Sequence, residues 1–215
     1  MLGAWAPALE ELYAADNDLS DVEHVTGEGG GTKVDGFRRL QTLDLSETSL
    51  TSWRQVMCFS SLPVLATLLL NHNRLEVIDD MRALESETRG GGGVSGAGTP
   101  RLAREDTTET TAGGKTAASG DSNQQPFASL EAIALTGNKI ADWGAVDRLS
   151  GLPALRSLRF SGNPVTSGLG ASEARAACIA RLSNLQRVNG SECSRRERNE
   201  AEKLYLRTLL QELAK

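Results

Sequence analysis

Few side chains in this chain of 215 residues could supply a nucleophile or a general base, because it has only two histidines and three cysteines. His24 and His72 are not part of a pattern that pairs a base with a serine or cysteine nucleophile. Cys58, Cys178 and Cys193 are odd in number and lack the spacing of metal ligands, so we expect small buried thiols in a reducing compartment. The sequence therefore predicts a protein that is not an enzyme, with no catalytic residues, no metal site and no cofactor.

Two short motifs match parts of known sites. The sequence "GGKT" at residues 113–116 resembles the end of a phosphate-binding loop, but Glu109 stands where that motif needs its first glycine. No hydrophobic strand precedes the motif either, so the sequence argues against a nucleotide site. The sequence "NGS" at Asn189 matches a glycosylation acceptor, but without a secretory signal we expect a turn there.

Charge and hydropathy argue against two further classes of function. The net charge of -5 and the pI near 5.2 are unlike the basic surface of a nucleic-acid-binding domain. The longest apolar run, "LPVLATLLL", is shorter than the roughly 20 residues that cross a bilayer. The N-terminus also lacks the basic and apolar segments of a signal peptide. We therefore expect a cytoplasmic protein that binds neither nucleic acid nor membranes.

A repeated pattern accounts for most of the large apolar residues. The pattern L-x-x-L-x-L-x-x-N/T-x-L begins at Leu40, Leu65, Leu130 and Leu155, and a degenerate first copy begins at Leu9. Full copies are 25 residues apart, except that a 40-residue insertion lengthens the second interval to 65. This is the leucine-rich-repeat pattern, in which alternate residues of a short strand point inward and form a continuous core. We expect the Asn or Thr at the ninth position to bond buried backbone groups.

A tryptophan follows two of the strands. Trp53 and Trp143 each lie five residues after the ninth position of their copy. Apolar residues at spacings of three and four continue from each tryptophan, which predicts a short helix that ends before Pro63 or Pro153. We expect these tryptophans to pack between helix and strand, and stacking on a ligand is the alternative.

The repeats divide the chain into four segments. Residues 1–84 carry the first half of the repeats, with a short glycine-rich loop at 26–36, and residues 126–190 carry the second half, including a helix at 172–181. Residues 85–125 hold nine glycines and seven threonines but few large aliphatic residues, so we expect a disordered insertion. Residues 191–215 predict a C-terminal capping helix. The expected fold is an α/β leucine-rich-repeat solenoid with a short parallel sheet on its concave side and short helices on its convex side.

The last segment carries the signals of a terminal helix. Ser194 and Glu197 have the spacing of a capping box. One apolar face, expected to cover the end of the core, consists of Ala201, Leu204, Tyr205, Thr208, Leu209 and Leu213. The charge run "SRRERNEAEK" mixes both signs, so we expect its side chains to form a solvated face. The N-terminal repeat has no comparable cover, which suggests a segment of a longer chain.

Several stretches go beyond the general repeat pattern: "LTSWRQV", "LPVLATLLLNHNRL", "IADWGAVDRLSGLPALRSLRFSGNPV" and "ARAACIARLSNLQRVNGSECSRRERNEAEKLYLRTLLQEL". They resemble the leucine-rich-repeat domain of the tubulin-specific chaperone E (tubulin-folding cofactor E) family and its chaperone E-like relatives. The resemblance implies a cytoplasmic, cytoskeleton-associated protein that binds α-tubulin and other tubulin-folding cofactors during assembly and dissociation of the tubulin heterodimer. Family members usually add a glycine-rich CAP domain before the repeats and a ubiquitin-like domain after them, and neither is found here. We expect a monomer.

The remaining candidates for function are the strand residues that point away from the core. Most are small and uncharged, which would allow another protein to approach closely; Leu69 is the expected apolar anchor and Arg159 a charged contact. The predicted partner-binding residues are Thr42, Asp44, Ser46, Thr67, Leu69, Asn71, Thr136, Ser157, Arg159 and Ser161, with Ala132 and Ala134 between them. Binding through loops or other domains is one alternative. Another is a phosphatase-regulatory repeat protein that holds a catalytic subunit on its concave face.

Overall fold

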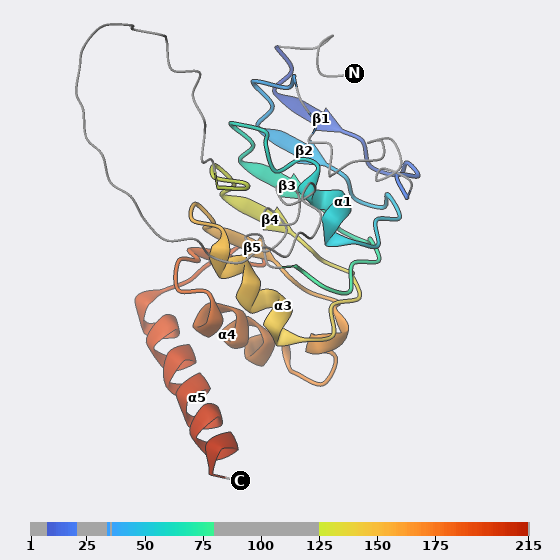
Figure 1. Ribbon diagram of the computed structural model, residues 1–215. Coiled ribbons are helices and arrows are strands. Elements are labelled where there is room, and N and C mark those ends of the chain that lie inside the picture. Colours follow the sequence, from blue (N-terminus) through green and yellow to red (C-terminus); the bar gives the residue numbers. More distant parts are fainter. Residues whose placement is uncertain (1–7, 21–33, 35, 80–124, 215) are drawn as a thin grey trace, which may run out of the picture.

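The strand segments of the repeats form one curved sheet. The computed structural model describes residues 8–20, 34, 36–79 and 125–214, and within them seven strands lie in sequence order (Figure 1). β1 to β6 are parallel, and β7 is antiparallel to β6. The strands are β1 (Glu11–Tyr13), β2 (Thr42–Asp44), β3 (Thr67–Leu69), β4 (Ala132–Ala134), β5 (Ser157–Arg159), β6 (Arg187–Val188) and β7 (Ser191–Glu192). The predicted parallel sheet is confirmed.

The core consists of the repeated apolar positions. In the four full copies every such position is buried except Val165, which is half-buried. Equivalent leucines stack directly, because Leu43, Leu68, Ile133 and Leu158 are paired through the sheet register. The degenerate first copy packs less tightly, since Leu9, Leu12, Ala14 and Leu19 are only partly buried. The fold is therefore a leucine-rich-repeat solenoid, as predicted.

A ladder of buried polar side chains joins one repeat to the next. Asn73 Oδ1 accepts hydrogen bonds from the backbone N–H groups of Thr48 (3.1 Å) and Leu50 (3.0 Å), and its Nδ2 donates to the carbonyl of Leu45 (2.8 Å). Asn138 and Asn163 repeat this arrangement one and two strands further along the sheet. The side chain thus supplies the partners that buried backbone groups need where the chain leaves each strand.

Short helices lie on the side of the sheet opposite its exposed face (Figure 1). They are α1 (Trp53–Met57), α3 (Trp143–Arg148) and the 3₁₀ turn η3 (Leu149–Gly151). Trp53 is only 1 % exposed, which confirms its expected core packing. Trp143 is half-buried and lies 6.2 Å from the Phe160 ring, between centroids. Its ring also faces the guanidinium of Arg181, 5.2 Å from the ring centroid.

The C-terminal end is built from η4 (Pro164–Thr166), α4 (Ala171–Arg181) and α5 (Arg195–Leu213). α4 agrees with the predicted helix at 172–181. α4 and α5 pack side by side (Figure 1). Arg175 on α4 forms an ion pair with Glu197 on α5, with 2.6 Å between Nε and Oε1, and also donates to the carbonyls of Val188 and Glu192. These contacts tie both helices to β6 and β7.

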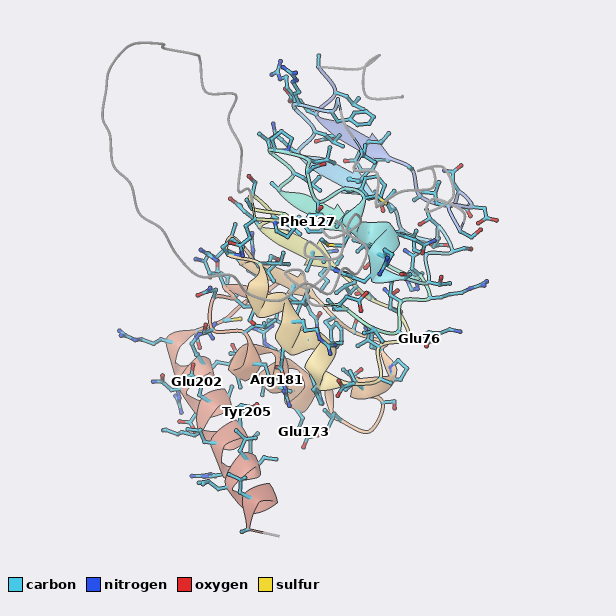
Figure 2. All side chains as sticks on the ribbon, viewed as in Figure 1. Glu76, Phe127, Glu173, Arg181, Glu202 and Tyr205 are labelled. Atoms are coloured by element: carbon cyan, nitrogen blue, oxygen red, sulfur yellow. The ribbon has the colours of Figure 1, made fainter. Side chains whose placement is uncertain are left out.

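Two more arginines fasten α5 to the repeats. The guanidinium of Arg198 donates to the carbonyls of Ile179, Leu182 and Leu185, where α4 ends and the last repeat begins. Arg181 faces the Tyr205 ring at 4.9 Å from its centroid (Figure 2), and pairs with Asp147 at 2.7 Å. The charge run is therefore not merely a solvated helix face, because Glu197 and Arg198 anchor the helix.

The rest of α5 extends beyond the solenoid. Ala201 is buried, but Leu204 is 50 % exposed and Leu213 is 85 % exposed, so the expected apolar face covers the core only over the first turns. The cause is length: α5 has 19 residues, whereas α4, against which it packs, has 11. The capping box is also only half formed. The Glu197 N–H donates to Ser194 Oγ at 3.1 Å, but the Glu197 carboxylate contacts Arg175 instead of the helix start.

The two halves of the repeats form one continuous sheet. β3 and β4 are adjacent in register, with Thr67 paired to Ala132, although 65 residues separate them in sequence. Only Gln125 of the expected insertion at 85–125 is described, and its Nε2 donates to the carbonyl of Gly151 at 2.8 Å. Residues 85–124, with "GGKT", lie outside the described residues. So does the glycine-rich loop at 26–36 apart from residues 34 and 36, and so does His24.

Candidate partner-binding surface

The face of the sheet opposite the core presents two rows of strand side chains. The register places Glu11, Thr42, Thr67, Ala132, Ser157 and Arg187 in one row, and Tyr13, Asp44, Leu69, Ala134 and Arg159 in the other. The side chains at the centre of this face, such as Thr67, Ala132 and Ala134, are small. Leu69 is half-buried and Ala134 is only 1 % exposed. The centre of the concave face is therefore apolar, with Leu69 partly accessible and Ala134 covered by its neighbours.

A third row of polar side chains follows the strands and is joined by hydrogen bonds. Ser46 Oγ accepts from the Asn71 backbone N–H at 3.2 Å, and Asn71 Oδ1 accepts from the Thr136 N–H at 3.1 Å. The Ser161 and Thr136 hydroxyls lie 3.5 Å apart. The Asp44 carboxylate similarly accepts from the Ser46 N–H at 2.9 Å. These predicted contact residues already stabilise the loops, so the strand residues left to contact a partner are the exposed Arg159 and the half-buried Leu69.

The two ends of the concave face carry opposite charges. Glu11 and Asp44 lie at the end near β1, and Arg159 and Arg187 lie near β6. Tyr13, 65 % exposed, donates from its hydroxyl to Glu11 Oε2 at 3.0 Å, and this hydrogen bond raises the pKa of Tyr13. The sequence-based selection missed Tyr13, Glu11 and Arg187 because it took only the four full copies. The same alternation in the first and last copies identifies all three.

The described residues offer little chemistry beyond this surface. They contain no group of three or more His, Cys, Asp or Glu side chains that could hold a metal ion. The exposed His72 ring lies against Gly137, where a Cβ would come within 2.4 Å of His72 Nδ1. Asn189 has a left-handed φ of 51°, and its Oδ1 accepts from the Phe160 N–H at 2.8 Å, so the expected turn is confirmed. Across these same ranges, no helix has the length and apolar character needed to cross a bilayer.

We expect the two buried thiols to resist modification. Burial raises the pKa of Cys178 to about 12 and also raises the pKa of Cys193, while Cys58 is buried on the convex side. Because the thiolate is the reacting species, Cys58 and Cys178 should not react with a disulfide reagent at pH 8, and Cys193 should react slowly. Thiol titration of the native and denatured protein measures this difference. Rapid reaction of all three cysteines in the native protein would contradict it.

The chain is similar in sequence to several known proteins. No protein-family model matches the chain. The Arabidopsis thaliana tubulin-folding cofactor E is 27% identical over 208 residues, which are 96% of this chain and 32% of that protein. Human tubulin-specific chaperone E is 29% identical, with 94% of this chain and 30% of that protein covered; the human cofactor E-like protein is 23% identical, with 94% and 37% covered. The chain thus spans about a third of the length of these relatives.

A solved structure shows the same fold. The Drosophila melanogaster SNF/U2A' complex contains a chain that matches 95% of this one with a TM-score of 0.52 at 16% identity, and 99% of that chain is covered. This likeness concerns the fold alone. Over about 95% of its length the chain has curated homologues that are tubulin-folding cofactor E and E-like proteins, so the predicted resemblance is confirmed.

Proposed function

We propose that this chain, whose curated homologues are tubulin-folding cofactor E and E-like proteins, is a non-enzymatic scaffold that acts in tubulin folding. The observation that carries the proposal is a similarity that extends over almost the whole chain, including the solenoid and its terminal helix. The segment "RERNEAEKLYL", which contributed to the resemblance found in the sequence, contains the residues that anchor α5: Glu197, Arg198, Ala201 and Tyr205.

The proposed contact surface is the concave face of the sheet. Its centre is apolar around the half-buried Leu69, where the neighbouring side chains are small enough to permit close approach of a partner. Its two ends carry opposite charges that can fix the partner's orientation. On this proposal α-tubulin, or another tubulin-folding cofactor, lies across the strands with an apolar contact at Leu69 and an acidic group at Arg159. On this proposal the interaction contributes to assembly and dissociation of the tubulin heterodimer. The protein acts as a monomer in the cytoplasm, in association with the cytoskeleton.

The alternative is a phosphatase-regulatory repeat protein that holds a catalytic subunit on the same face. The relatives above are named for tubulin folding, which does not favour it. The two functions predict different partners, so one capture experiment separates them.

We expect the chain to capture tubulin from a solution that also contains a phosphatase catalytic subunit. Leu69→Asp combined with Arg159→Glu should reduce tubulin capture at least about tenfold, because it places a carboxylate at the apolar centre and reverses the charge at the rim. Val77→Asp with Arg74→Glu makes the same chemical changes at exposed residues outside the strands and should leave capture unchanged. Equal tubulin capture by both double variants would show that tubulin does not bind the concave face. Retention of the phosphatase subunit instead of tubulin would favour the phosphatase-regulatory function.

A further inference from the structure

An open groove of about 710 Å³ lies at the C-terminal end of the solenoid, between the loop before β6, strand β7 and the first turn of α5. Its ionisable lining consists of Arg156, Arg187, Arg195 and Arg198 against one carboxylate, Glu192, with Cys193 beside it. Asn184 and Gln186, whose side chains carry amides, also line this groove. Among these residues, Arg187 also lies at the basic end of the proposed tubulin contact surface, and the others lie outside the rows of concave side chains.

The charge of this region differs from that of the rest of the chain. Residues 152–215 carry a net charge of +5, whereas residues 1–151 carry -10. Within the groove, Arg198 is held by three backbone carbonyls, and Arg156 Nη1 donates to the carbonyls of Pro153 and Leu155. These two arginines are therefore held in place in the wall of the groove. An anion that binds there would not have to pay the entropy cost of ordering their side chains.

Arg187 and Arg195 are different, because both are exposed and neither side chain forms a hydrogen bond or an ion pair with the residues that the structure describes. Arg187 is directly opposite Glu192 in the β6–β7 pair, yet no ion pair joins them in the described part of the chain. The groove thus combines fixed cations in its wall with two cations at its edge that are available to a ligand.

We propose that this groove binds an acidic peptide segment of a partner protein. Glutamate or aspartate side chains of the segment pair with Arg187 and Arg195, for which the planar guanidinium is well suited, and the amides of Asn184 and Gln186 bond its backbone. The volume is in the range of sites that hold ligands larger than a single inorganic anion. A long nucleic acid fits less well, because the -10 charge on the preceding residues repels a polyanion that extends past the groove.

The position of Arg187 connects the groove with the concave face. Arg187 is paired with Ser157 in the sheet register, so it is the last member of the first row of concave side chains. A partner on the concave face could therefore place an acidic tail in the groove. The inference goes beyond the proposed function, since a peptide can bind here whether or not tubulin binds the repeats.

The test uses the full 215-residue chain and a fluorescein-labelled octaglutamate peptide, followed by fluorescence anisotropy. We expect binding at low salt that weakens at least about tenfold when salt rises from 50 to 300 mM, as for interactions between exposed charges. Arg187→Gln with Arg195→Gln should weaken binding about tenfold or more, and Glu192→Gln should strengthen it about threefold, because it removes the one competing carboxylate. Neither arginine makes a described side-chain contact, so the double variant should keep the wild-type unfolding curve.

Two controls make the result specific. Arg38→Gln with Arg207→Gln removes the same charge from exposed positions outside the groove and should bind the peptide like wild type. An octaglutamine peptide should not bind. The proposal is overturned if the Arg187/Arg195 variant binds as tightly as wild type, or if both double variants weaken equally. It is also overturned if millimolar inorganic phosphate displaces all of the peptide, since the groove is then a site for small anions.

Discussion

Replacing Asn73 by alanine is expected to lower the free energy of unfolding by about 3 to 4 kcal/mol. The Asn73 amide serves backbone groups of its own repeat and of the preceding one, and it is only 3 % exposed. Alanine would leave the N–H groups of Thr48 and Leu50 buried without this acceptor. Each buried N–H group that loses its acceptor costs its full desolvation free energy, which is larger than the net contribution of one hydrogen bond to stability. Urea unfolding followed by circular dichroism measures the loss.

The chain offers a matched control at the same repeat position. Asn17 is exposed, and its Nδ2 donates only to the carbonyls of Ala14 and Ala15 within its own loop. Asn17→Ala should therefore change the free energy of unfolding by less than about 0.5 kcal/mol. Equal losses for the two variants would show that the ladder between repeats does not stabilise the fold.

The second large effect is expected at the junction of α4 and α5. Arg175→Met should reduce the free energy of unfolding by about 2 to 4 kcal/mol, since it leaves Glu197 and the carbonyls of Val188 and Glu192 without their cationic donor. Arg175 is 18 % exposed, so water replaces these contacts poorly. The same urea titration measures the change. Lys203→Met, which breaks an exposed ion pair with Glu200, should lose less than about 0.5 kcal/mol.

Acid should weaken the same junction. The hydrogen bond from Arg175 lowers the pKa of Glu197 below its ordinary value of 4.5. The stabilisation is therefore complete above pH 4.5 and is lost as the pH falls through the lowered pKa. The difference in stability between wild type and Glu197→Gln should be constant from pH 7 to pH 5 and should shrink in more acidic solution. A difference that grows on acidification would contradict the ion pair.

The repeat positions could be predicted because they are set by a local rule. One strand of alternating residues and one inward Asn or Thr recur in each copy, so the burial of Leu68 or Asn138 follows from its place in the pattern. The rule also tolerates the long interval between the second and third copies. The insertion leaves the pairing of Thr67 with Ala132 unchanged, because stacked repeats contact only their neighbours.

The attachment of α5 could not be predicted in the same way. Helical spacing identified Leu204 and Leu213 as one apolar face with Ala201, but spacing does not say how far the surface beneath the helix extends. The contacts that hold the helix are long-range bonds from arginines to backbone carbonyls. A carbonyl that needs a donor leaves no signal in the sequence, so Arg198 resembled any solvated residue of a charged helix.

The candidate surface was predicted in outline. Strand alternation placed Leu69 and Arg159 correctly on the face opposite the core. It did not show that Ser46, Asn71 and Thr136 hydrogen-bond one another, because those bonds depend on the distance between neighbouring loops. The same limit applies to the arginine groove, whose side chains come from three separate segments of the chain.

The central claim is that tubulin lies on the concave face, and site-specific photo-crosslinking tests it most directly. A photoreactive amino acid at position 69 lies at the centre of that face, and one at position 54, on α1, lies on the convex side. After irradiation with tubulin, mass spectrometry should find α-tubulin peptides joined to position 69 and none joined to position 54. Crosslinks from position 54 with none from position 69 would contradict the account.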